Sequence, residues 1–142
     1  MYRKILVALD NSRADRTLIP HVSELARLHR SQLLLVHVAD GFAARNFEQL
    51  NLRESEEMKN DRAYLENEAD KLRNDGLAVQ TVLELGDPAR QIVKTAAAEN
   101  CDLIAMTSHG HRLIGDNLHG STINEVRHQT DIPLLLVRAA KS

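Results

Sequence analysis

The segment after residue 103 brings together residues suited to binding an anion. A short apolar stretch at 103–106 is followed by a polar segment rich in glycine, and a helical pattern then begins at Gly120-Ser121-Thr122. Glycine lets the backbone approach an anion closely, and the unpaired N–H groups and partial positive charge of a helix N-terminus attract one. The other glycines and side-chain donors of the segment are His109, Gly110, His111, Arg112, Gly115 and His119. This arrangement predicts a loop that holds the phosphates of a nucleotide.

A carboxylate follows the first apolar run of the chain. Residues 5–9 are all hydrophobic, which is typical of a strand covered on both faces, and Asp10 comes directly after them. A carboxylate near a phosphate loop suits contact with a ribose hydroxyl or a bound magnesium ion. The alternative is structural, because Asp10 can form an Asx turn or a cap for the next helix, a role that Asn11 and Ser12 can share. The sequence leaves both interpretations open.

The elements that must position these residues alternate along the chain. Hydrophobic periodicity predicts strands at 5–9, 32–38, 78–85, 103–106 and 134–137. Helical patterns lie between them at about 14–30, 52–74, from 88 onward and from 120 to about 129. This order predicts an α/β fold, an open doubly wound sheet of five mostly parallel strands with helices on both faces. Ligands of such sheets bind at the carboxyl ends of strands, where the strand order reverses.

Several polar residues have local structural interpretations. His37 lies inside the second strand and is expected to be a buried residue with a hydrogen-bond partner. Gly76 is placed to end the long helix in a left-handed conformation. Asp87 is an expected N-cap for a helix that has Pro88 at its first position. The many charges of 52–74 predict a solvated helix face, and 41–51 reads as a loop.

Composition limits the classes of function. The 142 residues are 27% charged and 43% hydrophobic, which predicts a single globular domain over 1–142. A net charge of −2, with two Tyr, two Phe and no Trp, argues against nucleic acid as a partner. No apolar run approaches the roughly 20 residues that span a bilayer, and no signal-peptide pattern opens the chain, so we expect a cytoplasmic protein. The single Cys101 is expected to be a small buried residue.

The chain resembles the universal stress protein family over nearly its whole length. The resemblance lies in Lys-Ile-Leu-Val-Ala-Leu-Asp at 4–10, Leu-Leu-Val-His-Val at 34–38, Gly-Asp-Pro-Ala at 86–89 and Cys-Asp-Leu-Ile-Ala-Met at 101–106. Family members that bind ATP carry Gly, two residues, Gly, nine residues, then Gly-Ser or Gly-Thr. Gly110 and Gly120-Ser121 fit that spacing, whereas the first glycine is replaced by Thr107. Thr is β-branched and resists a positive φ, so it is expected to extend the strand and still offer its N–H.

The resemblance implies a Rossmann-like fold of the HUP type and a site for ATP or another adenine nucleotide, with or without magnesium. Ala8, Leu9 and Asp10 would border the adenosine, and Val38 would meet the adenine through its backbone. The phosphates would be held by residues of the loop and the helix start, with Met106 and Thr107 completing the site at the strand end. These phosphate-binding residues are His109, Gly110, His111, Gly120, Ser121 and Thr122. The family also implies a homodimer joined through the last strand, and an apolar strand at a sheet edge independently favours pairing with a second copy.

Binding is expected without efficient catalysis. The loop has no lysine in the position of a Gly-x4-Gly-Lys-Ser/Thr P-loop, and no residue is placed to activate a water molecule, so slow ATP hydrolysis is the most that we expect. The expected role is a nucleotide-responsive regulator in stress physiology that acts through an unidentified protein partner. One alternative is an interaction module with a non-functional nucleotide site, which the Thr107 departure favours. Another is a metal site made by the three loop histidines, although their spacing matches no closed zinc motif. A phosphorelay receiver is set aside, because Val137-Arg138-Ala139 supplies no lysine at the end of the fifth strand.

Overall fold

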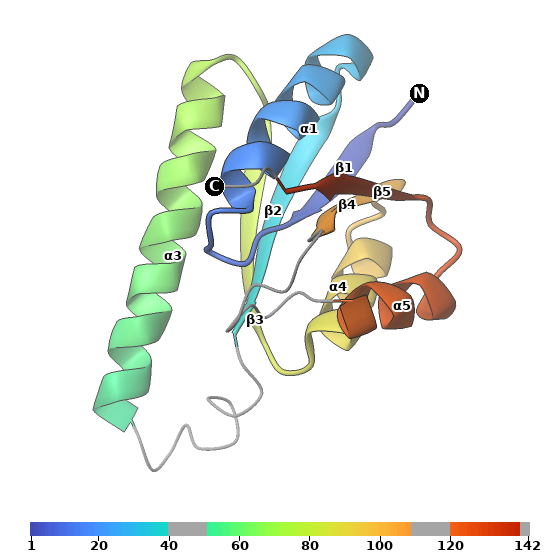
Figure 1. The fold of residues 1–142 in the computed structure, drawn as a ribbon. Helices are drawn as coiled ribbons and strands as arrows, with labels where there is room; N and C mark the ends of the chain where they lie inside the picture. Colours follow the sequence, from blue (N-terminus) through green and yellow to red (C-terminus); the bar gives the residue numbers. More distant parts are fainter. Residues whose placement is uncertain (40–50, 109–119, 140–142) are drawn as a thin grey trace.

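The computed structural model describes residues 1–39, 51–108 and 120–139. In this part of the chain, strands and helices alternate from one end to the other (Figure 1). Their bounds are β1 (Lys4–Ala8), α1 (Asp15–His29), β2 (Gln32–Ala39), α3 (Asn51–Asn74), β3 (Val79–Leu85), α4 (Pro88–Ala98), β4 (Leu103–Ser108), α5 (Gly120–Gln129) and β5 (Leu134–Arg138). The predicted elements are therefore present, and β4 is two residues longer than expected because it continues through Thr107 and Ser108.

The strands form one five-stranded sheet in the order β3-β2-β1-β4-β5, and every neighbouring pair is parallel. The chain moves outward from β1 through β2 to β3, then crosses back to β4 and continues outward to β5. The strand order thus reverses between β1 and β4. The predicted α/β sheet is confirmed, and the reversal gives it a defined switch point.

Helices cover both faces of the sheet (Figure 1), with α1 and α3 on one face and α4 and α5 on the other. Successive side chains of β1 lie on opposite faces of the sheet and pack in two different hydrophobic cores. Ile5 and Val7 pack with α1 and α3, whereas Leu6 and Ala8 pack with α4 and α5. All four are at most 2% exposed. This two-sided burial explains why the strand sequences are uninterrupted apolar runs.

The ends of two helices follow the sequence signals. After α3, Gly76 adopts φ +94°, its N–H bonds to the Arg73 carbonyl, and the Leu77 N–H bonds to the Leu72 carbonyl. These two bonds make a Schellman motif, as glycine at this position predicts. At the start of α4, the Asp87 side chain accepts a hydrogen bond from the Arg90 N–H, and Pro88 occupies the first turn. Both predicted caps are confirmed.

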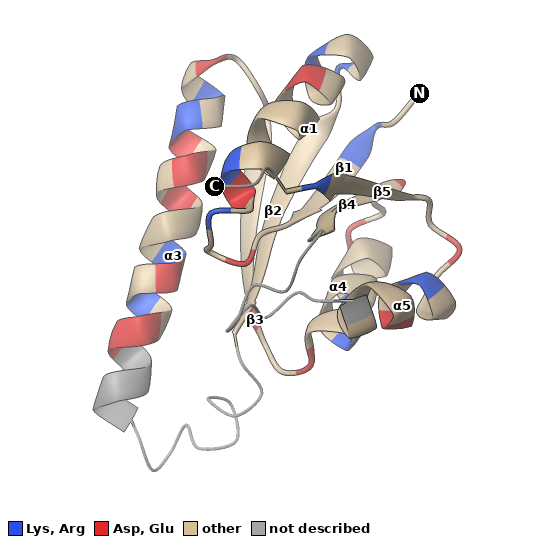
Figure 2. Cartoon of the chain, in the orientation of Figure 1, with Lys and Arg blue, Asp and Glu red and all other residues tan. Residues whose placement is uncertain are grey.

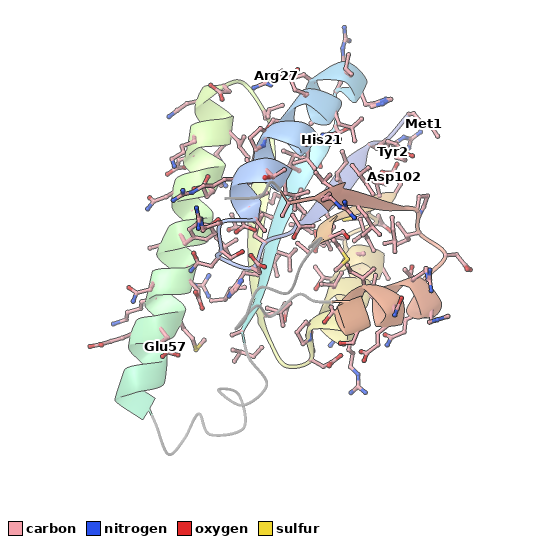
Figure 3. All side chains as sticks on the ribbon, in the orientation of Figure 1. Met1, Tyr2, His21, Arg27, Glu57 and Asp102 are labelled. Carbon is pink, nitrogen blue, oxygen red and sulfur yellow. The ribbon has the colours of Figure 1, made fainter. Side chains whose placement is uncertain are left out.

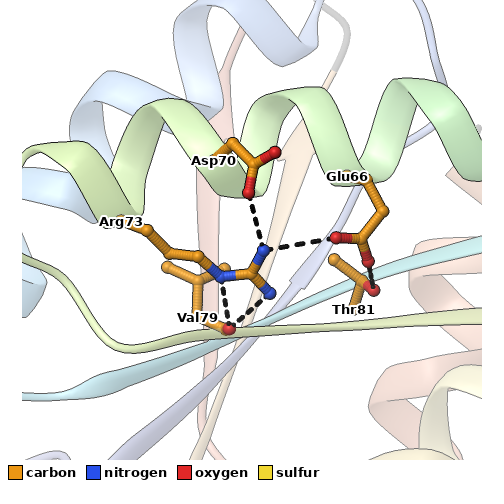
Figure 4. Close-up of polar contacts among 5 residues, drawn as sticks. All are labelled: Glu66, Asp70, Arg73, Val79 and Thr81. Carbon is orange, nitrogen blue, oxygen red and sulfur yellow. Dashed lines mark hydrogen bonds and ion pairs between the residues drawn. The ribbon is translucent and has the colours of Figure 1, made fainter.

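The charged face of α3 also has an anchoring role. Figure 2 shows acidic and basic residues interspersed along this helix. Arg73 pairs with Asp70 at 2.9 Å and Glu66 at 3.2 Å, and its guanidinium donates to the Val79 carbonyl of β3 (Figure 4). Glu66 accepts a hydrogen bond from Thr81 of the same strand, and these contacts lower the pKa of Glu66. The predicted solvated face therefore also ties α3 to the outer strand β3.

The amino-terminal end of the sheet is fixed by Asp102. Its carboxylate accepts hydrogen bonds from the Arg3 and Lys4 N–H groups at 2.9–3.1 Å, and Figure 3 shows it near Tyr2 at the entrance to β1. These contacts link the start of β1 to the segment that leads into β4. They act at the edge of the sheet opposite to the one where the strand carboxyl ends lie.

Replacing Asp102 by Ala should lower the free energy of unfolding by about 1–2 kcal/mol, because it leaves two backbone donors at the strand entrance without their acceptor. Urea denaturation followed by circular dichroism measures this. The matched control is Asp131→Ala, at an exposed carboxylate before β5, which should change the stability by less than about 0.5 kcal/mol. Equal losses in the two variants would contradict the role given to Asp102.

Candidate functional site

The sheet separates into two halves at the carboxyl ends of its strands. The pairing of β1 with β4 ends at Val7 and Ala105. In contrast, β2 and β3 stay paired as far as Ala39 and Leu85, and β4 and β5 as far as Ser108 and Arg138. The ladder between β1 and β4 does not continue beyond Ala105. The backbones of β1 and β4 are therefore no longer paired at the switch point. This is where an open α/β sheet accepts a ligand.

The predicted site residues of the strands converge on this position. Asp10 follows β1, Val38 lies near the end of β2, and Thr107 near the end of β4. Gly120, Ser121 and Thr122 form the first turn of α5, as predicted. Thr122 is buried and Ser121 is exposed. The first turn of an α-helix is a position that suits an anion.

Four of the predicted residues contribute no free side chain. Ala8, Leu9, Val38 and Met106 are at most 6% exposed and pack in the two cores. Both backbone polar groups of Leu9 already have partners. Its N–H bonds to the Val36 carbonyl at 2.8 Å, and its carbonyl contacts His37 Nδ1 at 2.9 Å. Of the predicted adenosine neighbours, Asp10 is therefore the one with a polar side chain, and Ala8 and Val38 can border a ligand only through main-chain atoms.

Asp10 belongs to a hydrogen-bonded turn, which we call the Asp10 turn (residues 10–14). Its carboxylate accepts a hydrogen bond from the Ser12 hydroxyl, and Ser12 Oγ in turn accepts the Ala14 N–H at 3.2 Å. Ala14, at the start of α1, makes no side-chain cap, and the first helical N–H groups bond to backbone carbonyls of the turn. The Asp10 and Ser12 side chains are therefore hydrogen-bonded to each other within the turn, and the N-cap position of α1, Ala14, has no side-chain cap.

Thr107 extends β4 and needs no unusual backbone conformation. Its partner in the ladder is Val137, and it is not among the described residues with positive φ. Its side chain is 1% exposed, and its hydroxyl has no hydrogen-bond partner among the described residues. A buried hydroxyl without a partner is uncommon and suggests that a bonding group is supplied from elsewhere.

Sequence reasoning missed the residue that holds the Asp10 turn, which is Asp15. Its carboxylate accepts hydrogen bonds from the Asp10 N–H at 3.2 Å, the Asn11 N–H at 2.9 Å and the Tyr64 hydroxyl at 2.5 Å. The available signal was an acidic residue in the first turn of a helix, five positions after Asp10. Nothing in the sequence linked it to Tyr64, which lies 49 positions away on α3.

Burial raises the pKa of Asp15 from 3.8 to about 6. The Tyr64 hydrogen bond and the two backbone N–H groups oppose this shift, and the nearby charge of Asp10 adds to it. Burial and the Asp15 carboxylate raise the pKa of Tyr64 above its usual range, so Tyr64 remains a proton donor. Because the folded chain holds this proton more tightly than the unfolded chain, the Asp15 contribution to stability decreases as the pH rises from about 4 to about 6.

His37 is structural, as predicted. It is 4% exposed, its Nδ1 contacts the Leu9 carbonyl, and its Nε2 lies 3.5 Å from Asp61 of α3. Cys101 is also buried, as predicted, and burial raises the pKa of its thiol to about 11.

Several predicted residues lie outside the described part of the chain: His109, Gly110, His111, Arg112, Gly115 and His119. The metal hypothesis rests on three of them. Within the ranges that the structure covers, no three His, Cys, Asp or Glu side chains are grouped to hold a metal ion. The loop expected at 41–51 falls almost entirely outside these ranges, and Asn51 begins α3. None of the described helices is both long and apolar enough to cross a membrane.

A hollow of about 580 Å³ lies beside the switch point, between α1 and α3. Asn11, Ser12, Asp15 and Tyr64 line it, together with Arg16 and other polar residues. No described residue of the predicted nucleotide site is among its lining. The hollow shares the Asp10 turn with that site but belongs to the α1 and α3 face of the sheet.

The chain matches the model of the universal stress protein family over residues 1–138. It is 31% identical to the universal stress protein MJ0577 of Methanocaldococcus jannaschii, in an alignment that covers 100% of this chain and 98% of that protein. The solved structure of MJ0577 superposes with a TM-score of 0.83 at 29% identity, covering 100% and 99% of the two chains.

Two further solved structures share the fold at lower identity. One is a universal stress protein in complex with cAMP, with a TM-score of 0.70, 18% identity and 98% of both chains covered. The other is the universal stress protein from Archaeoglobus fulgidus in complex with dAMP, with a TM-score of 0.65 and 23% identity over 96% of this chain and 98% of that one. By sequence match and by fold, the chain belongs to the universal stress protein family.

Proposed function

We propose that this protein binds an adenine nucleotide, specifically ATP, at the switch point between β1 and β4. The observation that carries the proposal is the end of the β1–β4 ladder at Val7 and Ala105, with Asp10 on one side and Thr107 on the other. Family structures solved with cAMP and dAMP support an adenine nucleotide as the ligand class. The start of α5 adds backbone donors suited to phosphate.

The roles of the residues follow from their positions. Asp10 would accept hydrogen bonds from the ribose hydroxyls, and the Val38 backbone would contact the adenine. The phosphates would lie against the 109–119 segment and the first turn of α5, where Ser121 and Thr122 add hydroxyl donors. The Thr107 hydroxyl, which has no partner among the described residues, would donate to a phosphate oxygen.

The protein would act as a regulator that responds to nucleotide and signals through a protein partner. Slow hydrolysis is the most that the residues support, because no side chain of the described site is placed to activate water and no P-loop lysine is present. A homodimer through β5 fits this role. β5 is the edge strand next to β4, and Leu136 on it is 44% exposed.

The interaction module with a non-functional site is the second candidate, and Thr107 in place of glycine is the observation that favours it. The structure weakens that observation, because Thr107 is accommodated as an ordinary strand residue. A calorimetric titration of nucleotide-free protein with ATP and magnesium, with phosphate release followed on the same sample, separates the two. Saturable heat with little release fits the nucleotide-binding regulator, whereas no heat would leave the interaction module.

Replacing Asp10 by Ala should weaken ATP at least tenfold and leave inorganic tripolyphosphate almost unaffected, because a lost charge-assisted hydrogen bond is worth about 1.5–3 kcal/mol. Calorimetry with both ligands gives the comparison. The matched control is Asp70→Ala, at an exposed carboxylate of α3. Equal weakening of both ligands by Asp10→Ala would instead indicate a magnesium ion or a purely structural turn.

Thr107→Val should move stability and affinity in opposite directions. Removing a buried hydroxyl that lacks a partner among the described residues should raise the free energy of unfolding of the nucleotide-free protein by about 1 kcal/mol. The same change should weaken ATP severalfold, because a phosphate would lose a donor. Thr81→Val is the control in another strand, and it should destabilise the protein without affecting ATP, because Thr81 bonds to Glu66. Unchanged ATP affinity in Thr107→Val would exclude the hydroxyl from the site.

A further inference from the structure

We propose that Tyr64 and Asp15 form a latch that positions Asp10 for the nucleotide, so that helix α3 sets the affinity of the site through the Asp10 turn. This inference rests on the proposed function. It concerns positioning residues, because neither side chain is assigned a contact with the ligand.

The latch is a single buried carboxylate that ties three groups together. Asp15 is 1% exposed, and one of its oxygens accepts the Asp10 N–H at 3.2 Å. The other oxygen accepts both the Asn11 N–H at 2.9 Å and the Tyr64 hydroxyl at 2.5 Å. The first two bonds fix the backbone of the Asp10 turn, and the third joins that turn to α3.

A second contact from α3 reinforces the first. Asp61, one helical turn before Tyr64, accepts a hydrogen bond from the Asn11 side chain at 3.2 Å. Its other oxygen lies 3.5 Å from His37 Nε2, and the opposite ring nitrogen of His37 contacts the Leu9 carbonyl at 2.9 Å. Residues 9 and 11, which flank Asp10, are therefore both linked to α3.

The turn has a conformation that needs such support. Asn11 has φ +59°, in the left-handed region that non-glycine residues adopt at some cost in energy. The Asp15 and Asp61 contacts hold its backbone and its side chain at the same time. Because hydrogen bonds weaken steeply with distance and angle, a turn released from these contacts would present Asp10 to a ribose less favourably.

The chemistry of Asp15 makes the latch sensitive to pH. Its ionised form supplies acceptors for all three donors, whereas protonation turns one oxygen into a donor and removes an acceptor site. Burial raises its pKa to about 6, so the latch is complete above that pH and loosened below it. Titratable and charged groups also lie on the elements packed around the Asp10 turn. They are Asp10 in the turn, His37 on β2, Asp61, Tyr64, Glu68 and Lys71 on α3, and Arg13 and Arg16 around the start of α1.

The test compares Tyr64→Phe and Asp15→Asn with wild type in titrations with ATP and with inorganic tripolyphosphate from pH 5 to pH 8. Tyr64→Phe keeps the packed ring and removes only the hydroxyl, and Tyr2→Phe is the matched control at a tyrosine beside His29, far from the turn. At pH 7.5 we expect Tyr64→Phe to weaken ATP about fivefold and tripolyphosphate hardly at all. Amide exchange at Asp10 and Asn11, measured without nucleotide, should be faster in Tyr64→Phe than in Tyr2→Phe.

The pH profile separates positioning from general structural support. Asn at position 15 mimics the neutral acid, and dividing wild-type affinity by that of Asp15→Asn cancels the titration of the nucleotide itself. The ratio should rise from near one at pH 5 to severalfold at pH 7.5, with a midpoint near 6.

A flat ratio, or Tyr64→Phe matching wild type for ATP at every pH, would overturn the latch. If wild type binds no ATP, the proposed function fails. The nucleotide role of the latch then fails with it, and faster exchange in Tyr64→Phe would leave only a structural contact.

Discussion

β1 is the central strand of the fold, because it needs hydrogen-bonding partners along both of its edges and apolar partners on both of its faces. The other strands and the helices are arranged around β1 to supply these partners. Parallel pairing with β2 and β4 supplies the edges, while α1, α3, α4 and α5 supply the faces. Such complete burial leaves polar chemistry only beyond the strand end. There the β1–β4 ladder stops, and the first polar residue after β1 is Asp10.

Two carboxylates, Asp10 and Asp15, lie close together at the edge of the buried core, where a negative charge is poorly solvated. Asp10 and Asp15 are both largely buried, and the charge of Asp10 adds to the rise in the pKa of Asp15 that burial causes. The chain meets this with donors from the turn and from α3, namely two backbone N–H groups and the Tyr64 hydroxyl. The long charged helix is in turn fastened to β3 by Arg73 and Glu66 (Figure 4). These contacts hold α3 against the outer strand of the sheet.

The fold was predictable because its signals are local. Apolar runs marked the strands, and Gly76 and Asp87 marked helix ends that the structure confirms. The start of α5 at Gly120 was predictable for the same reason. The support around Asp10 was not, because Asp15 meets Tyr64, and Asn11 meets Asp61, across 49 and 50 positions. Side chains so far apart in sequence become neighbours only when α3 packs beside α1. Spacing also could not show that Leu9, a predicted adenosine neighbour, already uses both its backbone groups.

The most direct test of a nucleotide site at the switch point is an amide chemical-shift titration of isotopically labelled protein with ATP and magnesium. The account predicts that the largest changes fall at Asp10, Val38, Thr107 and Ser108 and in the first turn of α5, while Arg3, Lys4 and Asp102 at the opposite end of the sheet stay unchanged. The absence of any saturable change, or changes confined to that opposite end, would contradict it.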